Sequence, residues 1–391
     1  MAKNIGAVIV CHLNHTNYGS CLQAYATIKM VQKFGYNISL IRYTKQRSIL
    51  DWLKIGPKLL VSGGIESLQI SAKRRSDERK YPTYLPNQRI REQATNRFKE
   101  REFVPLYKEY LGFNALCEGS RDYDAVFVGS DQVWKPWGFY SYYWNLLFVD
   151  DSIPKFSYAS SFGVSTIPHI QRRGTGKYLN RLDKISVREA KGKEIVESLS
   201  DKTATLVADP TMLFTPEEWR EFSQSSNKEI PSEKYIFCYF LGPRQEIREE
   251  AKKLAEQLNL KIVIMRHMDE YVPIEETMGD YAPYDIDARD FVKLMDNAEY
   301  VITDSFHGTV FSILLHKKFT TFYRVKPTSG VSTHSRIDSL LGLFGLTSRK
   351  FTGKISDITN DIDFSKVDYC RENLRNKSIL FLKQALKLAD K

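Results

Sequence analysis

Short apolar runs that alternate with polar turns are the main pattern of the chain, and the clearest example lies at residues 300–315. There the apolar run YVIT ends abruptly in the turn DSFHG and then gives way to helix-period apolar positions, which predicts a buried strand, a tight turn and a helix. In an open α/β sheet such a turn borders the crevice where ligands bind, and the helix points free N–H groups into that crevice. His307 is therefore expected where an anion would be held, and its ordinary pKa suits general acid or base chemistry. The alternative is a histidine that satisfies the backbone of its own turn.

The N-terminal residues predict the same arrangement. An apolar run at 5–11 precedes a polar turn at 12–20 and helix periodicity at 21–34, and residues 37–43 alternate like a second strand. Neither the dinucleotide fingerprint nor a Walker pattern is present, and an ordinary loop with a helix cap is the alternative. Four residues of this unit would stand at the crevice and are candidates for ligand binding: Asn17, Tyr18, Gly19 and Gln23.

A further crevice is predicted after the short apolar run at 125–128. The polar residues Ser130 and Asp131 follow that run directly, at the carboxyl end of a continuous buried strand. Asp131 could accept a proton from a hydroxyl or hydrogen bond to a sugar. The alternative is that one of the two side chains caps a helix.

Cationic residues follow several of the remaining strands. Arg188 ends a strand predicted at 185–189, where a guanidinium would bind a carboxylate or phosphate, unless it forms a salt bridge with Glu189 or a neighbour. In the second half of the chain, strand ends present Arg266 and Arg324 together with the turn that holds Asp304 and His307, and Arg336 lies at the start of a later helix. Convergence of arginine and histidine on one sheet edge predicts an anionic ligand.

The order of these elements predicts an α/β protein with two doubly wound, Rossmann-like domains. The first domain would span residues 1–211, a polar linker residues 212–233, and the second domain residues 234–350. Residues 351–391 would add a loop and a long amphipathic helix that packs back on the first domain.

Composition narrows the class of protein. With 391 residues, 42% of them hydrophobic and 27% charged, the chain is typical of a globular enzyme and too long for one ordinary core. Its net charge of +10 favours acidic partners, but no nucleic-acid motif is present, so no nucleic-acid partner is expected. Five scattered cysteines and the absence of a signal-like or membrane-spanning run predict a cytoplasmic protein. No cluster has metal-ligand spacing, so neither a metal nor a cofactor is expected.

An insertion at about residues 44–105 interrupts the strand and helix rhythm. It mixes short apolar clusters with Trp52 and a dense basic run at 73–80. Basic and apolar residues together favour contact with a membrane surface, which would place the protein peripherally at the inner membrane face. The alternative is a helical insertion with a solvated basic face.

Six ordered motifs, NYGSCLQAYA, VGSDQVW, SYASSFG, ISVREA, VADPTML and DSFHG, resemble the polysaccharide pyruvyl transferase family. The resemblance covers about residues 5–345 apart from the insertion. It implies a GT-B-like fold, in which the two domains face a central cleft. It also implies transfer of the enolpyruvyl unit of phosphoenolpyruvate to a sugar, with release of phosphate and formation of a cyclic pyruvate ketal. The acceptor would be galactose or another hexose of a capsular or exopolysaccharide precursor, either lipid-diphosphate-linked or soluble.

The resemblance assigns roles to the candidate residues. His307 matches the family's catalytic histidine, and Arg188 matches an arginine associated with the donor phosphoenolpyruvate. Relatives carry an arginine two residues before the histidine, where this chain has Ser305, so another cation is expected to compensate. The remaining candidates are Asp131 and Asp304 as the catalytic base, Gly308, Arg336, Arg266 and Arg324 with Ser305 on the donor side, and Asn17, Tyr18, Gly19, Gln23 and Ser130 on the acceptor side.

Two alternative functions are compatible with this fold. A glycosyltransferase that uses a nucleotide-sugar would share the cleft, and a non-catalytic glycan-binding protein would bind the sugar without using phosphoenolpyruvate. Nucleoside diphosphate binding would identify the first, and glycan binding without turnover would identify the second.

Overall fold

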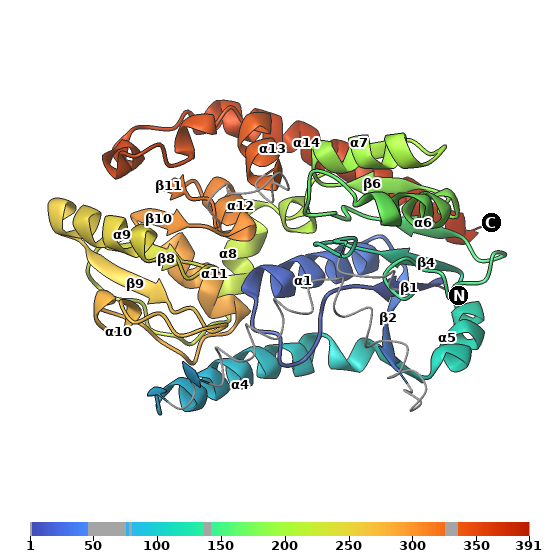
Figure 1. Cartoon of the computed structure of the whole chain (residues 1–391), viewed down its shortest axis with the longest axis horizontal. Helices are drawn as coiled ribbons and strands as arrows, with labels where there is room; N and C mark the ends of the chain where they lie inside the picture. The colour runs from blue at the N-terminus through green and yellow to red at the C-terminus, as the bar shows by residue number, and fades with distance from the viewer. Residues whose placement is uncertain (1, 46–75, 78–79, 137–141, 325–334, 391) are drawn as a thin grey trace.

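The computed structural model describes residues 2–45, 76–77, 80–136, 142–324 and 335–390 (Figure 1). Its first sheet has the order β3-β2-β1-β4-β5, and every pair is parallel. The central strands are buried apolar runs, as strands covered on both faces must be. The strands are β1 (Asn4–Val8), β2 (Asn37–Thr44), β3 (Tyr107–Leu111), β4 (Ala125–Val128) and β5 (Lys155–Ser157).

The parallel pair β6 (Ile185–Val187) and β7 (Ala204–Leu206) continues the first sheet beyond β5. The Ser157 amide donates to the Lys184 carbonyl at 3.0 Å, and Ser160 bridges to Val187. Strand ends from β4 to β7 therefore reach the same edge of the sheet.

A second parallel sheet has the order β11-β10-β8-β9. Its strands are β8 (Tyr235–Tyr239), β9 (Lys261–Met265), β10 (Tyr300–Thr303) and β11 (Lys318–Thr321). Chain order reverses between β1 and β4 in the first sheet and between β8 and β10 in the second, and these switch points are where doubly wound sheets bind ligands. The two sheets confirm the predicted α/β fold, a GT-B-like pair of Rossmann-like domains.

Within the described residues, the helices of the first domain cover its sheet. They are α1 (Tyr18–Lys33), α4 (Tyr84–Glu102), α5 (Phe113–Gly119), α6 (His169–Asn180) and α7 (Ala190–Leu199). Helices α1 and α4 also contact the second domain. Helix α1 is buried along most of its length and contacts α11 and α12 of the second domain. In Figure 1 it lies in the centre of the molecule, between the two sheets.

The helices of the second half of the chain are α8 (Pro216–Gln224), α9 (Gln245–Leu258), α10 (Glu275–Met278), α11 (Ala288–Asp296), α12 (Phe306–Leu314), α13 (Ser335–Leu343) and α14 (Phe364–Leu386). Residues 212–233, expected to be a linker because they are polar, carry α8. This helix begins with a capping box between Thr215 and Glu218, buries Trp219, and packs on α11. The segment between the sheets therefore carries a packed helix, followed by irregular structure up to β8.

Helix α4 lies in the insertion and connects the two domains. The Tyr84 hydroxyl donates to the Met268 carbonyl at 2.8 Å, and Arg91 Nε donates to the Tyr284 carbonyl at 2.8 Å. Figure 1 shows α4 running alongside both domains. Residues 46–75 and 78–79, which hold most of the basic run proposed to contact a membrane, lie outside the described residues.

The C-terminal helix α14 returns to the first domain. The Ala208 amide donates to Ser378 Oγ at 2.8 Å, and Arg375 Nε donates to the Leu213 carbonyl at 2.8 Å. Within the described part of the chain, no helix is both long and apolar enough to cross a bilayer.

Candidate active site

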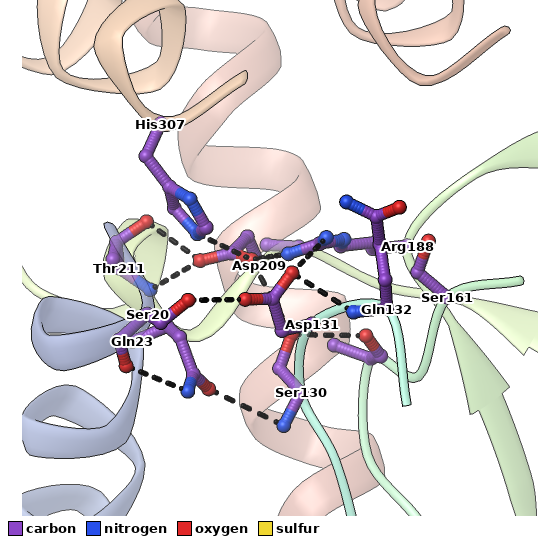
Figure 2. Close-up of polar contacts among 12 residues, drawn as sticks. Ser20, Gln23, Ser130, Asp131, Gln132, Ser161, Arg188, Asp209, Thr211 and His307 are labelled. Carbon is purple, nitrogen blue, oxygen red and sulfur yellow. Dashed lines mark hydrogen bonds and ion pairs between the residues drawn. The ribbon is translucent and has the colours of Figure 1, made fainter. Parts of the chain in front are cut away.

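Loops at the carboxyl ends of β4, β6 and β7 meet the first turns of α1 and α12 in one polar cluster between the domains (Figure 2). We call this cluster the cleft cluster. Its labelled side chains are Ser20, Gln23, Ser130, Asp131, Gln132, Ser161, Arg188, Asp209, Thr211 and His307.

Arg188 is the centre of the cleft cluster. Its guanidinium donates from Nη1 to Asp209 at 2.6 Å and from Nη2 to Asp131 at 2.9 Å. All three side chains are buried or nearly so. Burial alone would lower the pKa of Arg188, but Asp131, Asp209 and Glu189 outweigh it and raise that pKa. Arg188 is therefore held as a cation, with two of its nitrogens already committed to carboxylates.

Asp209 follows β7 and was not among the residues expected to form the site. Its Oδ1 accepts from Thr211 Oγ1 at 2.8 Å, and its Oδ2 accepts from Arg188 and from Ser130 Oγ at 3.3 Å. Burial would raise the pKa of Asp209, but His307 and Arg188 outweigh burial and lower it below its usual range. Asp209 is therefore a fixed anion on the first-domain wall of the cleft.

His307 belongs to the second domain and faces Asp209 across the cleft. Its Nε2 lies 3.4 Å from Asp209 Oδ2, too far for a well-formed hydrogen bond, and has no hydrogen-bond partner among the described residues. Ser305 caps α12 by accepting the Gly308 amide at 3.2 Å. The cap fixes the helix turn that carries His307 and so holds the imidazole opposite Asp209.

Gly19 lets the two domains approach at this point. A Cβ at position 19 would overlap the His307 ring near Nδ1. The residue was predicted to contact the acceptor, and in the structure its missing side chain makes room for the histidine.

Gly19→Ala is expected to push α1 away from His307 and lower kcat at least tenfold, because a methyl group cannot fit without a shift of an ångström or more. Steady-state kinetics would measure the loss. Gly342→Ala is the matched control, since a Cβ there meets no atom within 4 Å. Equal kinetics for Gly19→Ala and wild type would contradict the account of this contact.

The other predicted acceptor residues hold the cleft loops in place. Asn17 caps α1 by accepting the Ser20 amide at 3.0 Å, and the Tyr18 hydroxyl donates to the Ile286 carbonyl of the second domain at 3.0 Å. Gln23 Oε1 accepts the Ser130 amide at 3.3 Å. The polar groups in these contacts already have protein partners and need no ligand.

Asp131 lies directly beside Arg188. Its Oδ1 takes the bond from Arg188, and its Oδ2 accepts from Ser20 Oγ at 2.6 Å. Burial would raise the pKa of Asp131, but Arg188, His307 and Ser20 lower it below the usual range. A carboxylate with a depressed pKa and both oxygens engaged is a weak base.

Arg336 and Arg324 add positive charge to the cleft. Arg336 and Arg188 both lie over the Phe306 ring, 5.8 Å and 4.5 Å from its centroid. Burial, then the charges of Arg188 and Arg324, lower the pKa of Arg336 to about 10. The Nε atoms of Arg324 and Arg336 are buried and have no hydrogen-bond partner within the described chain. A bound anion would satisfy these groups and relieve their mutual repulsion.

Two further predicted site residues, Asp304 and Arg266, make their polar contacts away from the cleft cluster. Asp304 accepts from the amides of Leu241 at 2.6 Å and Gly242 at 2.9 Å, which ties the end of β10 to the end of β8. Arg266 donates to the Tyr284 hydroxyl at 2.5 Å and pairs with Glu276 at 3.4 Å. Asp304 therefore shapes the turn before His307, and Arg266 lines a neighbouring cavity. Among the described residues, no group of three or more His, Cys, Asp or Glu side chains could hold a metal ion.

Two Rossmann-like domains with a polar cluster at their facing strand ends define a GT-B-like enzyme. The chain belongs to the polysaccharide pyruvyl transferase family, whose family model matches residues 17–324, and it is therefore a transferase of that family. The match confirms the resemblance drawn from the six motifs, and all six lie within the matched residues.

Solved structures give more distant likenesses. UDP-GlcNAc 2-epimerase from Methanocaldococcus jannaschii is 12% identical, covers 96% of this chain and 93% of its own, and has a TM-score of 0.48. UDP-GlcNAc 2-epimerase from Neisseria meningitidis is 13% identical, with 97% and 99% covered and a TM-score of 0.46. ADP-heptose LPS heptosyltransferase II from E. coli is 12% identical, with 96% and 99% covered and a TM-score of 0.38. No curated protein sequence matches the chain significantly. Likenesses this remote do not bear on the chemistry.

Proposed function

We propose that the protein transfers the pyruvyl unit of phosphoenolpyruvate to hydroxyls of a hexose in a polysaccharide precursor and forms a cyclic ketal. The observation that carries the proposal is the pairing of His307 with Asp209 across the cleft, beside the cluster of Arg188, Arg324 and Arg336. This places a proton donor next to an unsatisfied cationic site. Membership of the pyruvyl transferase family supports the same chemistry.

The arginines would hold the donor. Phosphoenolpyruvate carries a carboxylate and a phosphate, and planar guanidinium groups bind both in a bidentate manner. Both Nη atoms of Arg188 are already paired with aspartates, so we assign donor binding mainly to Arg336 and Arg324, whose buried Nε atoms have no hydrogen-bond partner among the described residues. They would take the place of the arginine that relatives carry where this chain has Ser305. The N-terminus of α12 would add a favourable dipole for the anion.

His307 would act first as an acid and then as a base. Protonated on Nε2, it donates to the methylene carbon of phosphoenolpyruvate, and C2 takes on oxocarbenium character. A sugar hydroxyl attacks C2, phosphate leaves, and a second hydroxyl closes the ketal. Of the two hydroxyl protons released, one restores the proton on His307 and the other leaves with phosphate, so the step balances.

The two aspartates would stabilise charge and hold other side chains in position. Asp209 would stabilise the imidazolium form of His307, as a buried carboxylate does for a catalytic histidine. Asp131 would hold Arg188 and Ser20. The depressed pKa of Asp131 favours His307, rather than Asp131, as the group that removes the hydroxyl proton.

The experiment that tests this proposal is phosphate release from phosphoenolpyruvate by the wild-type protein. The acceptor panel would contain lipid-linked and nitrophenyl galactosides, glucosides and mannosides, with nucleotide-sugars assayed in parallel. Release that requires one acceptor would support the proposal and name the sugar. No release across the panel, together with hydrolysis or tight binding of a nucleotide-sugar, would contradict it in favour of glycosyl transfer.

Arg336→Gln is expected to raise the KM for phosphoenolpyruvate about 10- to 100-fold, the loss of one or two charge-assisted hydrogen bonds, with the acceptor KM unchanged. Arg121→Gln is the control, because Arg121 is exposed and pairs with Asp150 far from the cleft cluster. An equal rise in both KM values would argue that Arg336 supports the fold of the cleft and does not bind the donor.

A further inference from the structure

A second cavity lies between the domains, beside the cleft cluster. Its volume of about 170 Å³ is roughly ten times what one water molecule needs. We call it the α4 cavity, because helix α4 of the insertion forms one wall. The other walls are the loop at residues 14–18, the end of β8 at 239–241, and the loop at 266–269.

Two residues that line the α4 cavity carry buried polar atoms without a partner among the described residues. Tyr239 is 4% exposed, and its hydroxyl is buried with no hydrogen-bond partner in the described part of the chain. Arg266 Nε is likewise buried and unpartnered among the described residues. Buried polar groups are nearly always hydrogen-bonded, and the Tyr239 hydroxyl is a group of a cavity-lining residue that a bound ligand would satisfy by a small movement of the side chain.

The charges around the α4 cavity differ from those of the cleft cluster. Its acidic side chains Glu92 and Asp269 balance its basic side chains Arg91 and Arg266. Arg91 is further occupied, because it donates to the carbonyls of Tyr284 and Pro283. A balanced set of donors and acceptors suits a neutral, hydroxyl-rich ligand better than an anion.

The α4 cavity adjoins the reacting groups. Tyr18 lines it, and the next residue, Gly19, lies against the His307 ring. Leu241 also lines it and donates its amide to Asp304, three residues before His307. The α4 cavity therefore lies next to the elements that carry His307 and Gly19.

We propose that the α4 cavity binds a neutral sugar unit of the acceptor, with the Tyr239 hydroxyl hydrogen-bonded to that unit, so that helix α4 contributes to acceptor choice. The inference rests on the proposed function for its substrate class. It assigns to the insertion a role in recognition, because α4 supplies Arg91 and Glu92 to the cavity.

Tyr239→Phe tests acceptor binding by a change that should not impair folding. Removal of the hydroxyl takes away one hydrogen bond to the acceptor, so the acceptor KM should rise about tenfold while the KM for phosphoenolpyruvate stays unchanged. The unfolding temperature should stay equal or rise, because the free protein loses an unpaired buried hydroxyl. Tyr235→Phe is the control on the same strand. Its hydroxyl donates to the Leu294 carbonyl at 2.6 Å, so it should lower stability and leave the acceptor KM unchanged.

A binding measurement that needs no turnover distinguishes failure of this inference from failure of the proposed function. Saturation-transfer NMR with the nitrophenyl glycoside panel and with uridine diphosphate would be recorded on wild type and Tyr239→Phe. Glycoside binding that weakens in Tyr239→Phe would support the α4 cavity as a sugar site even if phosphate release were absent. Glycoside binding equal in both proteins, or displacement of glycoside by uridine diphosphate from this cavity, would overturn it.

Discussion

Replacement of His307 by alanine is expected to lower kcat by about a hundred- to ten-thousand-fold, the usual contribution of a general acid or base. The protein should still fold, because Arg188 remains paired with both Asp131 and Asp209 when His307 is removed. Acceptor-dependent phosphate release would measure the activity, and circular dichroism would verify the fold.

His316→Ala is the matched control for this substitution. His316 lies just beyond the same helix, and its Nε2 is 3.0 Å from Asp368 at the surface. Like His307, it is a histidine that faces an aspartate, but it lies outside the cleft cluster. Near-wild-type turnover by a folded His307→Ala protein would show that another group moves the proton.

Asp209→Asn is expected to reduce both stability and activity. Removal of one charge from a buried ion pair costs about 3 kcal/mol of unfolding free energy, here because Arg188 would lose the anion at its 2.6 Å contact. The kcat should fall about a hundredfold, since the imidazolium of His307 loses its facing carboxylate. Urea unfolding and steady-state kinetics would measure the two effects.

Asp131→Asn is the comparison that separates the effect of Asp209 on stability from its effect on catalysis. Asp131 also pairs with Arg188, so its loss should cost comparable stability, but the Asp209 and His307 pair remains and kcat should fall less. An equal loss of kcat in the two variants would contradict a direct role of Asp209 toward His307.

The pH dependence of stability has a definite sign. The folded-state pKa values of Asp131 and Asp209 lie below those of an unfolded chain. Their stabilisation is thus fully present above about pH 5 and is lost as the pH falls toward and below about 3, where the unfolded chain binds more protons. Burial raises the pKa of Glu189, so this residue makes the folded protein less stable as the pH rises. The Asp209→Asn protein should therefore lose less stability than wild type between neutral and acidic pH.

Site residues whose positions follow from a local hydrophobic pattern could be predicted from the sequence. The apolar run before His307 and the helix period after it placed the histidine at a strand end, because strand, turn and helix each leave a short-range signal. The position of Arg188 at a strand end was predicted in the same way. The alternative prediction for this residue, an ion pair, is also seen, and its closest partners are Asp131 and Asp209. The match to the pyruvyl transferase family agrees with this local reading.

Residues that act through long-range contacts were not predictable. Asp209 looks like the cap of an exit turn, which it also is, and its partner His307 is about a hundred residues away, so no local signal joins them. Arg266 was grouped with the other cations because it ends a strand, but β9 lies at the sheet edge, away from the switch point. Helix α8 did leave a signal, because Thr215 and Glu218 have capping-box spacing, and the polar composition of the segment concealed it.

The most direct test of the central claim is proton NMR of the product formed in deuterated water from phosphoenolpyruvate and the acceptor identified by the panel. Protonation of the methylene carbon by a solvent-exchanged His307 predicts a ketal methyl group that carries deuterium, with inorganic phosphate as the second product. A product that retains a vinyl methylene group, or an acceptor that gains a sugar from a nucleotide-sugar instead, would contradict the account.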